Sequence, residues 1–304
     1  MTENSLYVFL HIPRTGGTAF EYNIGHFLNR ENSSYKYHYN CNDISNIDIY
    51  YQHNIPTLSN RTSTQQKEIK VLTGHSTFVN SHKWFRIYKI PYFFTFIRNP
   101  IERLLSSFNY RYQATILTQD NSMFSLMQPI LNNNAIINKK TAEDYNTLYE
   151  YYLDADVEHN IQSKWLIKSY FTKTQHGWQH HPTYNGTISG LGTSPFGNVP
   201  VTIPEWMWED DSNSFDDLLS YVKEKLWWVS TTEQLTQSAI DFCQYLNIDY
   251  YENTLESINS STQYVKPKWS IEDVMNQPDI NKIIQNEKYD IELYNFAKQF
   301  KRPF

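Results

Sequence analysis

The hydrophobic pattern of this chain alternates between two kinds of segment. Short runs that are apolar at nearly every position predict buried β-strands. Four such runs occur, at residues 6–11 (LYVFLH), 69–74 (IKVLTG), 92–97 (YFFTFI) and 226–230 (LWWVS). Because every residue of YFFTFI is apolar or β-branched, this run predicts a central parallel strand that is covered on both faces.

Between these runs, apolar residues recur every three or four positions, as they do along one face of an amphipathic helix. This spacing predicts helices over residues 17–29, 100–112, 141–172, 231–246 and 279–300. Pro100 suits the first turn of its helix, where a proline loses no helical hydrogen bond. Ser230 followed by Glu233 resembles a capping box at the start of the helix over 231–246.

Two segments show neither the apolar runs expected of strands nor the spacing expected of helices. Residues 31–66 are rich in Asn, Ser and Tyr and predict loops. Residues 175–213 contain Gly, Pro, His and Trp without a clear period, which predicts an inserted loop or small hairpin region. The order of the other strands and helices predicts an α/β fold with a parallel sheet. We therefore expect a single domain over residues 1–304, with the irregular insert at about 175–213.

Charge and composition narrow the classes of function. The chain has 304 residues, a formal net charge of −6 and two cysteines, with no CxxC pair. An acidic chain is poorly suited to neutralising nucleic-acid phosphates, so we expect no nucleic-acid partner. The cysteine spacing indicates neither a disulfide framework nor a zinc site, and we expect no metal. The lack of a long apolar stretch or a leader-like N-terminus predicts a cytoplasmic protein without a membrane span.

Residues 10–20, LHIPRTGGTAF, join the first predicted strand to the first predicted helix. Glycines let a backbone come close to a ligand, and the N–H groups at the start of a helix attract anions, most often phosphate. Thr15 and Thr18 add hydroxyl groups, and Arg14 adds a permanent charge. The alternative interpretation is a plain strand-to-helix turn. The phosphate-loop patterns GxxxxGK[ST] and GxGxxG are both absent.

A second basic position follows the run YFFTFI. Arg98 comes directly after this predicted strand, and Ser106 lies eight residues later, within the helix predicted over 100–112. Either residue alone is typical of a protein surface. Together, at the end of a strand and on the helix that follows it, they are placed to reach one anion. The pair therefore indicates an anion-binding position downstream of the glycine loop.

These motifs resemble those of a known family. HIPRTGGTAF resembles the 5′-phosphosulfate loop of the sulfotransferases that use 3′-phosphoadenosine-5′-phosphosulfate (PAPS), and FIRNPIERLLSSF resembles their 3′-phosphate-binding strand and helix. The segments GHSTF, LWWVSTTEQLTQSAIDFCQYLNI and NEKYDIELYNFAKQF are also similar to this group, nearest to the heparan sulfate 2-O-sulfotransferases. The resemblance implies a P-loop-like domain of three layers, in which helices flank a central parallel sheet.

The resemblance also implies roles for the matching residues. The loop residues that would hold the 5′-phosphosulfate are Arg14, Thr15, Gly16, Gly17, Thr18 and Ala19. Arg98 and Ser106 would hold the 3′-phosphate, and His75 matches the histidine that serves as catalytic base. Lys266 and Lys268 lie where related enzymes place a basic loop over the nucleotide.

The chain departs from the family pattern at two positions. Arg14 replaces a lysine that is thought to contact the bridging oxygen as the sulfuryl group leaves, which makes Arg14 a candidate catalytic residue. A planar guanidinium and a compact ammonium are not equivalent in that role. Asn99 replaces a common aspartate, and Glu102 is an alternative base to His75.

Three functions are compatible with these motifs. The first is a sulfotransferase that moves the sulfuryl group from PAPS to a hydroxyl, of a carbohydrate or another acceptor, without a metal. It would leave 3′,5′-adenosine bisphosphate, and the resemblance also hints at a homo-oligomer. The second is a P-loop kinase or phosphotransferase, against which the missing Lys–Ser/Thr pair argues. The third is a non-catalytic nucleotide-binding homologue, for which the departure at Arg14 leaves room.

Overall fold

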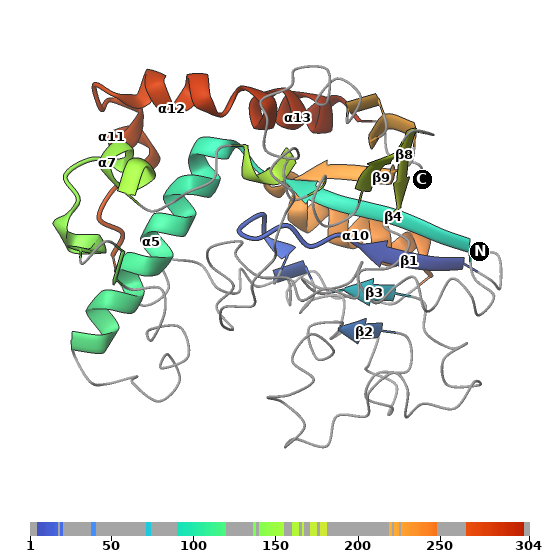
Figure 1. Ribbon diagram of the computed structural model, residues 1–304. Helices are drawn as coiled ribbons and strands as arrows, with labels where there is room; N and C mark the ends of the chain where they lie inside the picture. The colour runs from blue at the N-terminus through green and yellow to red at the C-terminus, as the bar shows by residue number, and fades with distance from the viewer. Residues whose placement is uncertain are drawn as a thin grey trace.

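Five parallel strands form the centre of the computed structural model, in the order β2-β3-β1-β4-β9 (Figure 1). They are β1 (Ser5–Phe9), β2 (His38–Asn40), β3 (Val71–Thr73), β4 (Ile90–Ile97) and β9 (Leu226–Thr231). The structure describes residues 5–17, 19–20, 38–40, 71–73, 90–119, 136–137, 140–154, 160–163, 166, 171–174, 177–180, 219–220, 222–224, 226–247 and 266–300.

All four predicted strands are confirmed, and the parallel sheet with them. The prediction of loops over residues 31–66 was wrong at β2, which pairs with β3 at the edge of the sheet. This strand has only three residues, His-Tyr-Asn, and so carries no recognisable alternation. Its pairing depends on β3, which is remote in sequence, and a local pattern does not contain that information.

The sheet is buried on both faces at its centre. Every residue of β1 is buried, and so are residues 93–97 of β4, as the run YFFTFI predicts. One face carries aromatic rings that pack on α10 (Leu235–Tyr245), where Phe242 lies 5.0 Å from the ring of Phe94 and 6.1 Å from Trp228. Burial of such large rings supplies much of the stability of the core.

The other described elements are short apart from one long helix. They are α5 (Pro100–Gln119), β5 (Ile136–Ile137), β6 (Lys140–Thr141), η3 (Ala142–Asp144), α7 (Leu148–Asp154), β7 (Phe171–Thr174), β8 (Gly177–His180), η5 (Thr232–Gln234), α11 (Ile271–Met275), α12 (Ile280–Asn286) and α13 (Lys288–Gln299). In Figure 1, α5 continues from the carboxyl end of β4 to the side of the molecule where α7, α11 and α12 gather.

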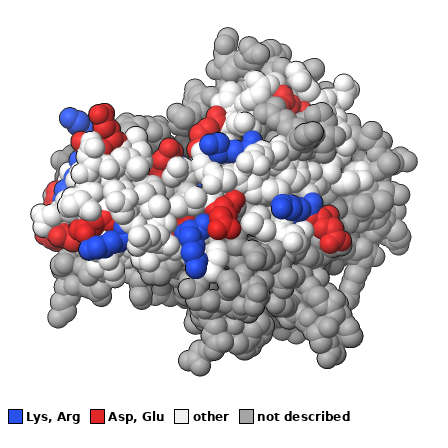
Figure 2. All heavy atoms as spheres, turned by 90° about the horizontal axis from the view of Figure 1, so that it is seen from above, with Lys and Arg blue, Asp and Glu red and all other residues white. Residues whose placement is uncertain are grey.

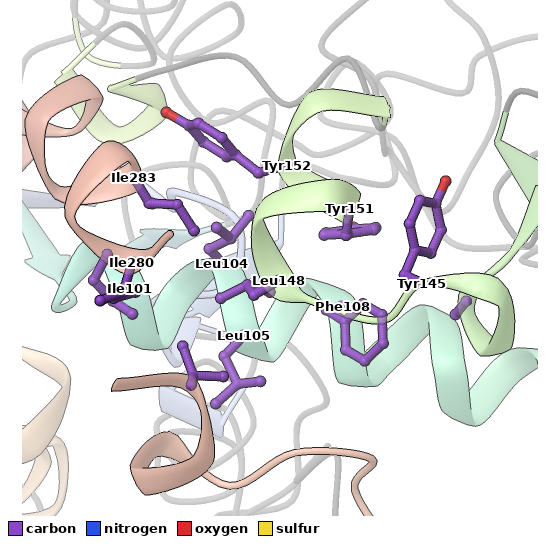
Figure 3. Packing of buried hydrophobic residues seen from close by; sticks show 12 residues of the cluster. Ile101, Leu104, Leu105, Phe108, Tyr145, Leu148, Tyr151, Tyr152, Ile280 and Ile283 are labelled. Carbon is purple, nitrogen blue, oxygen red and sulfur yellow. The ribbon is translucent and has the colours of Figure 1, made fainter. Parts of the chain in front are cut away.

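A second hydrophobic core forms on α5, away from the sheet. Ile101, Leu104, Leu105 and Phe108 recur at helical spacing and are buried. Figure 3 shows these side chains packed in one cluster with tyrosines of the segment 145–152 and isoleucines of α12. This core fixes α5, and therefore the helix face on which Ser106 lies, against the C-terminal part of the chain.

Two helix predictions need correction, and one helix was missed. The mostly helical segment expected over 141–172 contains α7 but ends in β7, which forms an antiparallel hairpin with β8. This hairpin reaches into the insert predicted at 175–213, whose remaining residues lie outside the described part. The helix expected over 279–300 is two helices, α12 and α13, and the short helix α11 was missed.

The capping box predicted at Ser230 is also wrong. The hydroxyl of Ser230 contacts the side chains of Gln234 and Ser238, at 3.4 Å and 2.8 Å, and the segment after β9 begins as the 3-10 turn η5 without a side-chain cap. A capping box does occur at Ser270, whose hydroxyl accepts from the backbone of Asp273 at the start of α11. Ser270 is followed by acidic residues in the first turn, which is the signal that this helix offered.

Candidate functional site

The loop between β1 and the helix that follows it is tightly folded. Arg14 and Gly16 both have positive φ angles, 69° and 82°. The hydroxyl of Thr15 donates to the carbonyl of Ile12 at 2.8 Å, so its proton is used within the loop. Gly17, Ala19 and Phe20 are helical, and the amide of Phe20 donates to the carbonyl of Gly16 at 3.1 Å. The first N–H groups of this helix therefore have no partner within it, as expected of an anion-binding turn.

Close packing accounts for both glycines of the loop. A Cβ atom at Gly16 would lie 3.2 Å from Leu235 and 3.3 Å from Thr232, and the positive φ angle adds strain for any side chain. At Gly17 a Cβ atom would overlap the imidazole of His11, which is buried beneath the loop. The loop is thus held between the end of β1 and the start of the segment after β9.

We expect Gly17→Ala to lower the free energy of unfolding by about 1–3 kcal/mol, because the new methyl group overpacks against His11. In an ordinary helix the same change stabilises, since alanine has the better propensity. Chemical denaturation measures the difference. A double-mutant cycle with His11→Ala isolates the cause: the double variant should lose less than the sum of the single losses, and simple additivity would contradict the packing argument.

Arg14 connects the two motifs that the sequence places 92 residues apart. Its Nη2 atom donates to the backbone carbonyl and to the hydroxyl oxygen of Ser106, both at 3.0 Å. Its guanidinium also lies over the ring of Tyr110, one turn further along α5, at 4.4 Å from the ring centre. The glycine loop and the face of α5 that bears Ser106 therefore form one site.

Arg98 lies where β4 ends, next to the start of α5. Its backbone is held by the side chain of Gln162, which accepts from the Arg98 amide at 2.8 Å and donates to its carbonyl at 2.9 Å. Asn99 caps α5, since its side-chain oxygen accepts from the amides of Ile101 and Glu102. An amide oxygen performs this capping role as well as a carboxylate does, so the replacement of the usual aspartate leaves the cap intact.

Positive charge is concentrated at this site. Burial, together with the nearby charges of Arg98 and Arg103, lowers the pKa of Arg14 to about 10, and Tyr110 partly offsets the effect. Burial also lowers the pKa of Arg98, which Glu102 and Glu233 partly offset. Arg14 and Arg98 both keep their charge at neutral pH, as arginine does in proteins. Their mutual repulsion shows that they lie near one another, and an anion bound between them would relieve it.

Within the described part of the chain, the Nε atoms of Arg14 and Arg98 have no hydrogen-bond acceptor. Nε of Arg14 is buried and has no hydrogen-bond partner among the described residues. Nε of Arg98 is likewise without an acceptor there, its ion-pair partner Oε2 of Glu102 lying at 3.6 Å. Buried donors without acceptors are costly unless a ligand satisfies them. The residues present therefore fit an anionic group such as a phosphate.

Glu102, the alternative to His75 as a base, is paired with an arginine of the site. Its carboxylate oxygen Oε2 lies 3.6 Å from Nε of Arg98, so the group proposed as a base takes part in an ion pair. In Figure 2, basic and acidic side chains are interspersed over the described part of the face shown. The mixed charge on this face agrees with the acidic net charge of the chain, from which we expect any anion site to be local.

A buried polar network, which the sequence patterns did not reveal, holds the backbone of Arg98 in place through Gln162. Asp290, in the first turn of α13, accepts from the backbone amide of Gln162 at 2.9 Å and from the amide and hydroxyl of Ser163 at 2.8 Å and 2.7 Å. Asp290 is fully buried. Because Gln162 in turn holds both backbone groups of Arg98, the network links the last helix to the anion site.

Asn160 explains why the C-terminal helix is interrupted. Its side-chain oxygen accepts from the amides of Tyr289 and Asp290 at the start of α13, and its side-chain nitrogen donates to the carbonyl of Asn286 at the end of α12. Glu287, between the helices, accepts from the amide of Asn160 and from the hydroxyl of Tyr152 at 3.0 Å. The only local signal for this break was the acidic residue Asp290 in a first helical turn.

The buried carboxyl of Glu287 makes stability depend on pH. Burial, together with the neighbouring charge of Asp290, raises its pKa from 4.5 to about 7. A carboxyl whose pKa rises on folding takes up a proton as the chain folds, so stability is lost as pH rises through that pKa. We expect a loss of about 1.4 kcal/mol between about pH 6 and 8 from this group. Glu287→Gln should flatten the unfolding free energy over that range, and an unchanged slope would contradict the assignment.

Two predicted site residues, His75 and Thr18, lie outside the described residues. Lys268 lies at the surface of the second core, where its ammonium donates to the carbonyls of Glu143 and Tyr145, both at 2.6 Å. Lys266 is exposed. The described contacts bring neither lysine to Arg14 or Arg98, so their role at the nucleotide stays a prediction.

No group of three or more His, Cys, Asp or Glu side chains in the described part of the chain is arranged to hold a metal ion. None of the helices within the described ranges has both the length and the apolar character needed to cross a membrane.

Comparison with known proteins agrees with this geometry. A model of the sulfotransferase family matches residues 1–185, which is more than half of the chain and includes the glycine loop, Arg98 and Ser106. A comparison with curated protein sequences gave no match. The parallel sheet flanked by helices is consistent with the P-loop-like fold that the motifs imply. The chain therefore belongs to the sulfotransferase family.

Proposed function

We propose that this chain is a PAPS-dependent O-sulfotransferase, which transfers the sulfuryl group of PAPS to an acceptor hydroxyl and leaves 3′,5′-adenosine bisphosphate. One observation carries the proposal. The glycine loop and α5 are joined by the two 3.0 Å hydrogen bonds from Arg14 to Ser106, so both anion-binding motifs belong to one site. Membership in the sulfotransferase family supports the transferase chemistry.

Each motif would bind one end of the nucleotide. The backbone N–H groups at the start of the first helix have no partner within that helix, and in the loop that contains Gly16 and Gly17 they suit the 5′-phosphosulfate. Arg98 and Ser106 suit the 3′-phosphate. The hydroxyl oxygen of Ser106 accepts from Arg14, which leaves its own proton available for a phosphate oxygen.

The protein contributes orientation and charge stabilisation. When bound, PAPS supplies a sulfuryl group whose bond to the 5′-phosphate oxygen breaks as the acceptor oxygen bonds to sulfur. The loop N–H groups hold the 5′-phosphate in place and stabilise the negative charge that develops on it. The rigid supports of the loop, Thr232 on the carbonyl of Thr15 and His11 against Gly17, keep these donors fixed.

We assign the removal of the acceptor proton to His75. This residue follows β3 by two positions in the sequence, and β3 is the parallel neighbour of β1. The carboxyl ends of parallel strands share one edge of a sheet, where ligands bind in α/β folds. An imidazole titrates near neutral pH and suits a general base. Its similarity to the GH segment of heparan sulfate 2-O-sulfotransferases supports a carbohydrate hydroxyl as acceptor.

A thermal-shift comparison tests the donor assignment. At about 100 times its dissociation constant, 3′,5′-adenosine bisphosphate should raise the melting temperature by roughly 5 °C, since a ligand that binds only the folded state stabilises it. ATP with Mg²⁺ should give little change. Stabilisation by ATP–Mg²⁺ without stabilisation by the bisphosphate would favour a phosphotransferase and contradict the proposal.

The base assignment has its own test. We expect His75→Ala to lower the rate of transfer from radiolabelled PAPS to a polysaccharide panel by about 10²–10⁴-fold, with the affinity for 3′,5′-adenosine bisphosphate unchanged. His38→Ala, on the edge strand β2, is the matched control and should keep the rate. If His75→Ala binds the nucleotide and retains the full rate, His75 is not the base.

A further inference from the structure

Arg14 has a backbone conformation that is unusual for a residue other than glycine. A residue other than glycine rarely adopts a φ angle near 69°, and such strained positions persist only where the surroundings hold them. Here two contacts do so, the hydrogen bonds to Ser106 and the ring of Tyr110 under the guanidinium. Both contacts come from α5, the helix that follows Arg98.

The geometry of these contacts directs the side chain away from its own loop. Nη2 uses its two protons on the carbonyl and hydroxyl oxygens of Ser106. Nε remains buried without an acceptor among the described residues. A planar guanidinium has five N–H groups, so Arg14 can hold Ser106 and still donate to an anion that Ser106 also contacts. A lysine ammonium has three donors and no planar fork with which to do both.

The charged groups near Arg14 also favour an anionic ligand at this position. Among the described residues, the charged groups that act on the Arg14 guanidinium are Arg98 and Arg103, both of the same sign as Arg14. Arg98, by contrast, has Glu102 as an ion-pair partner and Glu233 as a further negative charge nearby. The Arg14 guanidinium thus lies beside Ser106 without a counter-charge from the described residues, which suits a doubly charged phosphate.

We propose that Arg14 is a specificity-determining residue that recognises, together with Ser106, the 3′-phosphate of the donor nucleotide instead of its 5′-phosphosulfate. This assignment rests on the proposed function, because it presupposes a nucleotide with phosphates at both positions. It gives the arginine a role different from that of the lysine it replaces, and it makes the 3′-phosphate a requirement for tight binding. The glycine loop then holds the 5′ end through its backbone alone.

Calorimetric titration of two nucleotides tests the assignment. We expect Arg14→Ala to weaken binding of 3′,5′-adenosine bisphosphate by about 10–100-fold and to leave binding of 5′-adenosine monophosphate within about twofold. Ser106→Ala should show the same selective loss, to a smaller degree. An equal loss for both nucleotides would place Arg14 at the 5′ end and overturn the inference, and so would unchanged affinity for both.

A second pair of variants makes the result independent of the folding of Arg14→Ala. Tyr110→Leu removes the ring face on which the guanidinium lies, and Tyr110→Phe keeps it. The leucine variant should lose affinity for the bisphosphate alone, while the phenylalanine variant should match the wild type. If both variants bind like the wild type, the inference fails. A wild-type protein that does not distinguish the two nucleotides would instead refute the proposed function.

Discussion

Replacement of Asp290 by alanine is expected to lower the free energy of unfolding by about 3–5 kcal/mol. The change leaves three donors without acceptors, the amides of Gln162 and Ser163 and the hydroxyl of Ser163. Each buried donor without a partner costs about 1–3 kcal/mol. Asp290 also lies in the first turn of α13, where its charge is favourable. Urea denaturation measures the loss.

Ser163→Ala is the matched control for this variant. It removes only the hydroxyl that donates to Asp290 and leaves both backbone bonds in place, so it should cost about 1 kcal/mol. If Asp290→Ala costs no more than Ser163→Ala, the carboxylate does not hold the segment 160–163. The folded fraction of Asp290→Ala should also bind 3′,5′-adenosine bisphosphate more weakly, because Gln162 no longer fixes the backbone of Arg98.

The second large effect concerns the nucleotide. We expect Arg98→Ala to weaken binding of 3′,5′-adenosine bisphosphate by about 2–3 kcal/mol, or roughly 30–150-fold. The variant removes a charged donor and leaves the phosphate without its partner at the end of β4. Calorimetry measures the affinity, and urea denaturation verifies the fold.

Lys282→Ala provides the control for net charge. Lys282 lies on α12 and pairs with Asp279 at 2.7 Å, so its loss changes the total charge by the same amount without touching the site. Its affinity for the nucleotide should equal that of the wild type. An Arg98→Ala variant with wild-type affinity would show that Arg98 binds no phosphate.

The sequence predicts the elements that carry the site because their signals are local. A fully apolar run marks β4, and Pro100 with apolar residues at helical spacing marks α5, so Arg98 and Ser106 are placed correctly on the end of a strand and on the next helix. The glycine loop is recognisable for the same reason. Such patterns depend on residues that are near one another in the chain.

What the sequence did not predict depends on contacts between distant residues. The division of the last helix at Glu287 comes from Asn160, whose side chain caps one helix and closes the other. The bond from Arg14 to Ser106 likewise joins positions 92 residues apart. No period or composition encodes a side-chain hydrogen bond across such a distance. The supporting role of Gln162 was therefore visible only in three dimensions.

The central claim is that the glycine loop and the Arg98–Ser106 pair form one site for a nucleotide with phosphates at both ends. The most direct test is the ratio of two dissociation constants of the wild-type protein, measured by calorimetry. We expect 3′,5′-adenosine bisphosphate to bind at least about 30-fold more tightly than 5′-adenosine monophosphate, since the second phosphate gains charged hydrogen bonds. Equal affinities for the two nucleotides would contradict the claim.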